Sequence, residues 1–520
     1  MLKPLLSLLI VVLSILGIAD ASYLTYEKFS GKIPVCGPGF DCGTVLNSPY
    51  SNIGPIPLSA LGLVYYGILF TFGILHYVEF DLKRLNKALR LPFNFKPLHY
   101  LQLISTFGIL FSGYLVFLMG VIIQAWCQYC MYSAIISATI WLLMVAYTHL
   151  VEKEPPALLK WLWYRFCDVG YQRIIKPLCF RVDPEIVHER VSGIGQTLGK
   201  IPFLVGLTSL FFSYDHPKNS VTLAGIQFPG KVGLSAGFDY NGRLTSILPA
   251  VGFGFHTLGT ITLQRYDGNP KPAYVRLKAS QGLIVNKGLK NSGARSIIET
   301  LSPLRFTIPT GISIASTNTH FNSTKEQILD IISCFYLFEN STVDHAYYEL
   351  NISCPNTFGG EPFTIPERLE KLLRALDALE LSKPVFVKMP IDQSKKETLA
   401  LLDICARHTV AGVIFGNLTK DKNNPALTSA DKKTWQEHKG NVSGKPTWER
   451  SNTLIALTKK TYLDRFVIIG TGGIFSAKDA AHKLAIGADL VQLITGMIFQ
   501  GPQVIGSINQ HLAEESISDE

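Results

Sequence analysis

Charged side chains are scarce in this 520-residue chain, at 17% of all residues, and few of them precede Val151. Basic residues still exceed acidic ones, and the formal net charge is +9. The sequence has no basic cluster interleaved with aromatic residues, so nucleic acid is not an expected partner. A role at a membrane surface explains the positive excess better.

Histidine is missing from the neighbourhood of two close cysteine pairs, Cys36/Cys42 and Cys127/Cys130. The pairs also lie in different predicted loops, so no metal is expected there. The second pair has the C-x-x-C spacing at which two thiols exchange electrons with a partner disulfide. Structural disulfides are the alternative. The remaining cysteines are scattered through the rest of the chain: Cys167, Cys179, Cys334, Cys354 and Cys405.

Four apolar blocks precede Val151, each near the ~20 residues that cross a bilayer as a helix. They cover residues 5–24, 57–78, 100–126 and 127–150. The loop between the second and third blocks is basic (Lys83, Arg84, Lys87, Arg90 and Lys96), which predicts a cytoplasmic loop. Both termini are then cytoplasmic, and both cysteine pairs face the oxidising side.

The first block has a second interpretation. Residues 1–22 also have the pattern of a signal peptide, with Lys3, an apolar run and a possible cleavage site at Ala19-Asp20-Ala21. Cleavage there would remove the first span without reversing the other three.

The cysteine motifs resemble a known family. Cys36-Gly-Pro-Gly-Phe-Asp-Cys42, then Ser48-Pro49-Tyr50 and Cys127-Gln-Tyr-Cys130, are similar to the bacterial vitamin K epoxide reductase family over residues 5–150. The resemblance implies a four-helix transmembrane bundle that oxidises thiols and reduces a membrane quinone. It implies that Cys130 is the thiolate beside the quinone and Cys127 its disulfide partner. Cys42 and Cys36 would relay electrons, and Ser48 would belong to the quinone site.

The same resemblance has consequences for location and partners. It implies the inner membrane of a bacterium, with the cysteine loops in the periplasm and residues after Val151 in the cytoplasm. Many relatives carry a thioredoxin-like domain, which this chain does not have. A separate periplasmic thioredoxin-like protein is therefore the expected electron donor.

Residues 151–156 form a short charged linker that contains proline. The segment 158–214 is rich in aromatic and basic residues, including Trp161, Trp163 and Arg165. This composition predicts amphipathic helices against a bilayer or a quinone tail, with a simple interdomain helix as the alternative.

Eight short apolar runs follow, with helical patterns such as 366–379 and 396–408 between them. This alternation over about 270 residues predicts a (β/α)8 barrel. The runs are 232–236, 255–259, 311–315, 347–353, 385–389, 412–416, 466–470 and 490–495.

Polar and small residues gather where these runs end, which is where barrel enzymes build their sites. Gly470-Thr-Gly472-Gly473 and Ile494-Thr495-Gly496 end the last two runs, and their backbone N–H groups suit a phosphate. Lys388 ends the fifth run and would direct a cation into the site, although a solvated lysine is an alternative.

The stretch from Glu349 to Asn356 places amides on both sides of Cys354. It resembles the dihydroorotate dehydrogenase family, together with Ala236-Gly-Phe-Asp239, Gly268-Asn-Pro-Lys-Pro272, Ser443-Gly-Lys-Pro446 and 470–474. The resemblance covers residues 170–512 and implies an FMN-binding barrel that oxidises a dihydropyrimidine. The segment 182–189 is similar to the membrane-bound, quinone-using class, and it makes His188 and Arg276 candidates for the quinone passage.

By this resemblance Lys388 would stabilise the reduced flavin, with Ala236, Thr260 and Asn351 beside it. Gly444, Gly472, Gly473 and Thr495 would hold the FMN phosphate. Asn351, Asn356 and Asn417 would bind the substrate ring. Cys354 stands where the family has its catalytic base; the quinone-using class has serine there and the soluble class cysteine, so this chain mixes the two. A thiol must have a depressed pKa to serve as a base at neutral pH.

Four positions depart from the family pattern. Tyr240 replaces a lysine that contacts flavin and substrate, and Val285 replaces a substrate-binding asparagine, although Asn286 is adjacent. Ser313 and Leu418 replace a further Asn and Thr. Each lost hydrogen bond to a buried substrate costs about 1–3 kcal/mol. A different substrate, or a silent flavin-binding scaffold, is therefore the alternative to dihydroorotate oxidation.

The sequence thus predicts a transmembrane domain at 1–150, quinone-access helices at 151–215 and an FMN barrel at 216–520. The expected function is a bifunctional membrane redox enzyme. One half would couple periplasmic thiol oxidation to quinone reduction, and the other would oxidise dihydroorotate with quinone as acceptor.

Overall fold

The computed structural model describes residues 2–148 and 156–518 and divides into two compact units, Met1–Leu162 and Trp163–Glu520. The predicted linker lies outside the described residues except for Pro156, as do the last two residues of the fourth predicted span.

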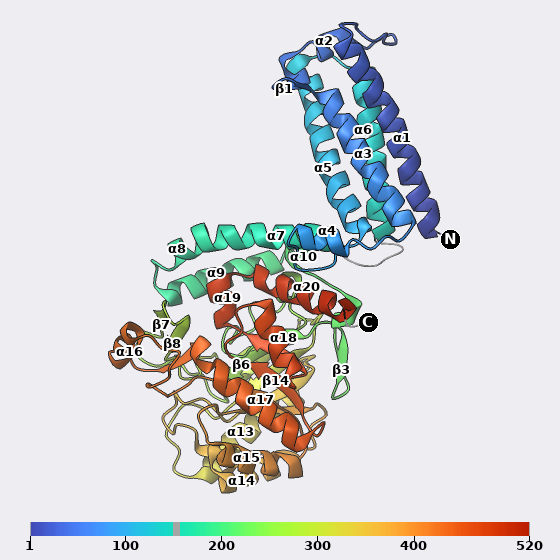
Figure 1. Ribbon diagram of the computed structural model, residues 1–520. Coiled ribbons are helices and arrows are strands. Elements are labelled where there is room, and N and C mark those ends of the chain that lie inside the picture. Colours follow the sequence, from blue (N-terminus) through green and yellow to red (C-terminus); the bar gives the residue numbers. More distant parts are fainter. Residues whose placement is uncertain (1, 149–155, 519–520) are drawn as a thin grey trace. The chain divides into compact units, whose positions relative to one another are not determined.

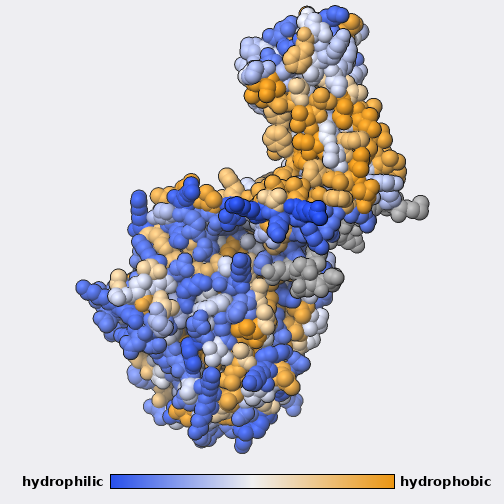
Figure 2. All heavy atoms as spheres, in the orientation of Figure 1, coloured by the Kyte–Doolittle hydropathy of each residue, from blue (hydrophilic) through white to orange (hydrophobic). Residues whose placement is uncertain are grey.

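The first unit is a bundle of four long apolar helices, which confirms the predicted spans (Figure 1). Their hydrophobic side chains cover the sides of the bundle in Figure 2. The helices are α1 (Leu2–Phe29), α3 (Leu58–Tyr77), α5 (Pro97–Phe117) and α6 (Gln128–Tyr147). A π-helical turn, η2 (Leu118–Ile123), extends α5. Helix α1 is longer than its apolar block and runs unbroken through Ala19–Ala21.

Short elements join these helices. The segment between α1 and α3 contains α2 (Cys42–Leu46), η1 (Pro49–Ser51) and the strands β1 (Asn52–Ile53) and β2 (Ile56–Pro57). Helix α2 begins after Asp41, whose carboxylate accepts a hydrogen bond of 3.0 Å from the Thr44 N–H, as an N-cap residue does. The basic loop contains α4 (Lys83–Ala88).

Helices precede the barrel, as predicted for 158–214, and the first of them crosses the boundary between the two units at Leu162 and Trp163. They are α7 (Ala157–Gly170), η4 (Tyr171–Ile175), α8 (Lys176–Cys179), α9 (Pro184–Gly199) and α10 (Pro202–Phe212). Helices α9 and α10 meet at an angle of 112°. Proline begins both helices, where its missing N–H costs nothing. Apolar side chains such as Phe203 (75% exposed) and Leu210 (65%) remain outside the core.

Eight parallel strands close into a barrel, which confirms the fold class. Around the barrel they are β5 (Val232–Leu234), β6 (Phe255–Ile261), β9 (Thr310–Ile314), β10 (Tyr347–Asn351), β11 (Val385–Met389), β12 (Val410–Phe415), β14 (Val467–Thr471) and β15 (Leu490–Leu493). Each overlaps one predicted run. Strand β15 is shorter than its run because the chain turns into a helix at Thr495.

Helices cover the outside of the barrel (Figure 1). They are α11 (Leu248–Val251), α12 (Ala294–Leu301), α13 (Thr324–Glu339), α14 (Pro366–Asp377), α15 (Lys395–Arg407), α17 (Trp448–Tyr462), α18 (Ala477–Ala485), α19 (Thr495–Gln500) and α20 (Gln503–Ser518). The main core lies between these helices and the strands, where Leu350, Leu372 and Val413 are fully buried.

Two small sheets accompany the barrel in the described part of the second unit. One joins β7 (Tyr274–Leu277), β8 (Gly282–Val285) and β13 (Asn441–Gly444), all antiparallel. The other pairs β3 (Val221–Leu223) with β4 (Ile226–Phe228). The three-stranded sheet positions Val285 and Ser443 in the cavity described below.

Candidate functional site

A cavity of about 470 Å³ lies at the carboxyl ends of the barrel strands. It extends between these strand ends and helices α8 and α9, where its wall includes Phe180, Val187 and Val191. The residues that the sequence analysis assigned to flavin, substrate and quinone meet around it and around an adjoining pocket of about 90 Å³. These residues are Ala236, Thr260, Asn351, Cys354, Asn356, Lys388, Asn417, Gly444, Gly472, Gly473, Thr495, His188 and Arg276.

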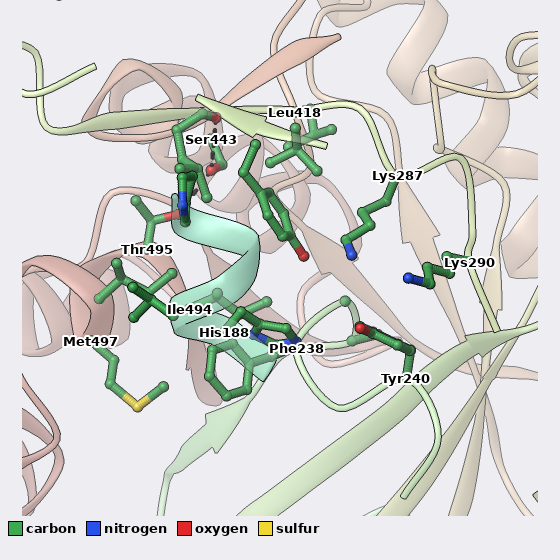
Figure 3. A pocket seen from close by; sticks show the side chains of 18 of the residues that line it. His188, Phe238, Tyr240, Lys287, Lys290, Leu418, Ser443, Ile494, Thr495 and Met497 are labelled. Atoms are coloured by element: carbon green, nitrogen blue, oxygen red, sulfur yellow. Dashed lines mark hydrogen bonds between the residues drawn. The ribbon is translucent and has the colours of Figure 1, made fainter. Parts of the chain in front are cut away.

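The smaller pocket is walled by backbone. Gly444, Gly472 and Gly473 line it with φ angles of 93°, 91° and 75°, which side-chain-bearing residues rarely adopt. A Cβ on Gly472 would lie 2.5 Å from Thr447 Oγ1. Thr495 closes the wall, and its hydroxyl lies 2.8 Å from that of Ser443 (Figure 3). Glycines let a ligand approach the backbone closely, which suits a phosphate, so these residues could hold that of FMN.

Lys388 projects from β11 into both pockets. Its side chain is 6% exposed, and its ammonium lies 3.3 Å from Ser235 Oγ and 3.8 Å from the carboxylate of Glu349. Glu349 is fully buried and accepts a 2.6 Å hydrogen bond from Ser313. The lysine is therefore a buried, paired cation, and the alternative of a solvated side chain is wrong.

The three asparagines are held by the chain itself. Asn351 donates to Thr260 Oγ1 at 2.9 Å, and Asn417 donates to the Ser353 carbonyl at 2.7 Å. Asn356 donates to the Val285 carbonyl at 2.9 Å. Hydrogen bonds within the chain thus orient these amides at the cavity wall.

Cys354 lies half-buried among these amides. Burial raises the pKa of its thiol to about 11, whereas the sequence argument required a depressed pKa. The desolvation that causes the rise could not be read from the neighbouring residue types. In this structure Cys354 is protonated at neutral pH.

His188 and Arg276 lie on the apolar side of the cavity. The His188 ring packs on Phe238 and Tyr240, with centroids 4.8 and 5.7 Å away (Figure 3). Arg276 donates to the Val182 carbonyl at 2.7 Å, and its guanidinium lies 4.6 Å from the centre of the Phe180 ring. This end of the cavity suits an apolar, planar ligand.

The four residues that depart from the family pattern lie in different parts of the site. Tyr240, Val285 and Leu418 line the cavity. Tyr240 donates its hydroxyl hydrogen bond to Glu189 on α9, at 2.7 Å. Ser313 lies behind the wall, 2.9 Å from Thr260 Oγ1.

Sequence reasoning missed two lysines of this cavity, Lys287 and Lys290. Both follow β8, and Figure 3 shows their side chains directed into the cavity opposite Tyr240. The only signal was their closeness in sequence to Val285. Glu349 belongs to the 349–356 motif, but the sequence alone does not indicate its pairing with Lys388.

The first unit brings the two cysteine pairs together. Cys36 and Cys42 form a disulfide, while Cys127 and Cys130 are free, with the Cys130 N–H 3.4 Å from Cys127 Sγ. All four belong to one hydrophobic cluster. The Gly37 N–H donates to the Gln128 side chain at 2.9 Å, which ties the first loop to the second. Among residues 2–148 and 156–518 no group of metal-ligating side chains occurs.

A second apolar cavity, of about 680 Å³, lies within this bundle. Cys130 and Ser48 both line it, as the vitamin K epoxide reductase resemblance implied for a quinone site. Asp20 from α1 also lines it, and one of its carboxylate oxygens is buried with no hydrogen-bond partner among the described residues. Cys127 is not part of this wall; it lies behind Cys130, fully buried.

Comparison with known proteins agrees with the division of the chain into a helical bundle and a barrel. The family model for dihydroorotate dehydrogenase matches residues 219–515, and that for the vitamin K epoxide reductase family matches residues 8–145. The dihydroorotate dehydrogenase (quinone) of Gloeobacter violaceus is 34% identical over 344 residues, which cover 66% of this chain and 93% of the relative. That of Idiomarina loihiensis is 33% identical over 349 residues, covering 65% and 99%.

Solved structures agree on the fold. The ligand-free dihydroorotate dehydrogenase of Eimeria tenella matches with a TM-score of 0.56 and 26% identity, over 64% of this chain and 94% of that one. The same enzyme in complex with ferulenol matches with a TM-score of 0.57 and 24% identity, over 65% and 92%. The chain is an oxidoreductase that belongs to the dihydroorotate dehydrogenase family and carries a vitamin K epoxide reductase domain at residues 8–145.

Proposed function

We propose that the barrel oxidises dihydroorotate to orotate with FMN as cofactor and a membrane quinone as acceptor. The observation that carries this proposal is a backbone-walled phosphate pocket that adjoins a cavity with three oriented amides beside Cys354 and an apolar end at α8 and α9. These residues would hold FMN, which would supply an acceptor for the substrate hydride and a donor of electrons to quinone.

In this proposal the chain's own groups bind and deprotonate the substrate. Asn351, Asn356 and Asn417 hydrogen-bond to the ring. Cys354 removes a proton from carbon in the small fraction of molecules whose thiol is deprotonated at neutral pH. Lys388 offers a cation to negative charge that develops on the flavin. The apolar end beside His188 and Arg276 receives the quinone ring.

The test is anaerobic mixing of the purified, detergent-solubilised protein with dihydroorotate, followed by flavin absorbance near about 450 nm. Prompt bleaching that added quinone reverses, and that Cys354→Ala abolishes, supports the proposal. A fully loaded flavin that stays oxidised contradicts it. Tyr240, Val285 and Leu418 in the cavity wall would then favour the second candidate, oxidation of a different substrate.

For the first unit we propose thiol oxidation coupled to quinone reduction. Cys130 lines the apolar cavity, Cys127 is its neighbour, and the Cys36–Cys42 disulfide lies in the same cluster, so electrons have a route from outside to quinone. The thiols of Cys127 and Cys130 give up two electrons and two protons and become a disulfide. The quinone takes up these electrons and protons and becomes a quinol.

In this proposal the basic residues of one loop determine the orientation of the first unit in the membrane. The basic loop with α4 lies in the cytoplasm of a bacterium, and the cysteine loops lie in the periplasm, where a thioredoxin-like protein supplies electrons. Residues 1–150 form the membrane domain, 151–215 the quinone-access segment and 216–520 the FMN barrel.

The experiment for this half follows reduction of a short-chain quinone by dithiothreitol in detergent. Cys130→Ser abolishes this reduction in the proposed mechanism, while Cys167→Ser, a half-buried cysteine on α7, serves as the control. Equal rates in the two variants would contradict a role for Cys130.

A further inference from the structure

A cationic cluster stands at the mouth of the barrel cavity. The ammonium groups of Lys271, Lys287 and Lys290 lie 3.3, 3.1 and 3.6 Å from the carboxylate of one residue, Glu185. Three lysines around one carboxylate leave positive charge in excess. Such a cluster attracts anions.

Lys287 is the most enclosed member of this cluster. Its side chain is 11% exposed, compared with 34% for Lys290 and 82% for Lys271. The ammonium lies 5.2 Å from the centre of the Tyr240 ring and 4.8 Å from that of Tyr274, both favourable for a cation. Burial lowers the pKa of Lys287, and its hydrogen bond to Glu185 opposes that shift. An enclosed ammonium binds an anion more strongly than a solvated one does.

The direction of Lys287 places it in the substrate region. It lines the same cavity as Cys354 and the three asparagines, and Figure 3 shows its nitrogen directed into that cavity, toward the side of Tyr240. The other buried lysine of the cavity, Lys388, already faces Glu349 at 3.8 Å. Tyr240 has no charge, and its hydroxyl is directed to Glu189.

We propose that Lys287 binds the carboxylate of the barrel's substrate, a ring carboxylate, and so takes over at the end of β8 the task of the lysine that the family resemblance expects at position 240. This inference rests on the proposed function and names a residue of the same site. The carboxylate of Glu185 lies 3.1 Å from the Lys287 ammonium. In this proposal the carboxylate of the substrate takes its place.

The test is titration of the FMN-loaded, full-length protein with orotate, followed through the change in flavin absorbance, which reports binding without turnover. Lys287→Met raises the Kd for orotate at least about tenfold, because a hydrogen bond to a charged group is lost. Lys278→Met, an exposed lysine in the turn between β7 and β8, is the matched control and leaves the Kd unchanged. Equal Kd values for Lys287→Met and the wild type would overturn the inference.

A parallel titration with benzoate, a ring carboxylate without a pyrimidine edge, separates this inference from the proposed function. If the loaded wild type binds benzoate in a Lys287-dependent way but does not bind orotate, the dihydroorotate assignment fails and the role of Lys287 stands. If it binds neither, both fail.

A second variant covers the case in which Lys287→Met does not retain flavin. Glu185→Gln removes the competing carboxylate and keeps Lys287, so it tightens orotate binding several-fold in this scheme. Unchanged or weaker binding by Glu185→Gln would then overturn the inference.

Discussion

The ammonium of Lys388 lies 3.8 Å from the carboxylate of Glu349, and both side chains are almost completely buried. Buried charges of this kind stabilise a protein only while both are present, because a lone buried charge is poorly solvated. The pair therefore links barrel stability to the cation that faces the proposed flavin site.

We expect Lys388→Met to lower the free energy of unfolding of the barrel by about 3–5 kcal/mol, because Glu349 would remain as an unpaired charge. The double variant Lys388→Met/Glu349→Gln should recover much of this stability but not the rate of flavin reduction. Denaturant unfolding and anaerobic flavin bleaching measure the two effects. Lys396→Met, in the exposed face of α15, is the control. Full recovery of the bleaching rate in the double variant would contradict a role for the Lys388 charge.

The pKa of about 11 for Cys354 predicts a pH dependence. Only the deprotonated thiol can accept a proton, so the rate of flavin bleaching should rise about tenfold per pH unit from about pH 7 to about pH 10. Single-turnover mixing across this range measures the slope. Cys405→Ser, which changes a buried cysteine of α15 outside the cavity, should leave the slope unchanged. A flat profile would show that Cys354 does not limit the step.

Gly472→Ala should abolish most FMN binding. Its φ of 91° disfavours a side chain, and the new Cβ would lie 2.5 Å from Thr447 Oγ1, so strain of about 1–3 kcal/mol falls on the wall of the phosphate pocket. Flavin content per protein after purification is the measurement. Gly359→Ala is the matched control, because a Cβ there meets no heavy atom within 4 Å. Normal flavin content in Gly472→Ala would place the phosphate elsewhere.

Arg276→Met should raise the KM for quinone about tenfold, because the cation beside Phe180 is lost from the apolar end of the cavity. The rate of anaerobic flavin reduction by dihydroorotate should not change, since that step involves no quinone. Arg265→Met is the control, because the side chain of Arg265 is 71% exposed. A loss of flavin reduction with no change in quinone KM would move Arg276 to the substrate side.

Much of the fold could be predicted because hydrophobic patterns decide it. The eight barrel strands coincide with apolar runs such as 385–389, and the four long helices of the first unit coincide with apolar blocks of membrane length. The site residues at strand ends could be predicted for the same reason, since parallel strands bring their carboxyl ends to one face of a barrel.

The position of Lys287 in the cavity wall could not be predicted in this way. Its position depends on the antiparallel sheet of β7, β8 and β13, and its partner Glu185 is 102 residues away in sequence, on α9. The direction of the Cys354 pKa shift was also out of reach, because it depends on how much water the folded cavity excludes around the thiol.

The presence of a membrane bundle and a barrel in one chain determines the ratio in which the two domains are synthesised. Every translated copy contains one vitamin K epoxide reductase domain and one barrel, so the two are produced in a one-to-one ratio that gene dosage or promoter strength cannot alter. Any change in the balance between the two domains must therefore come after synthesis.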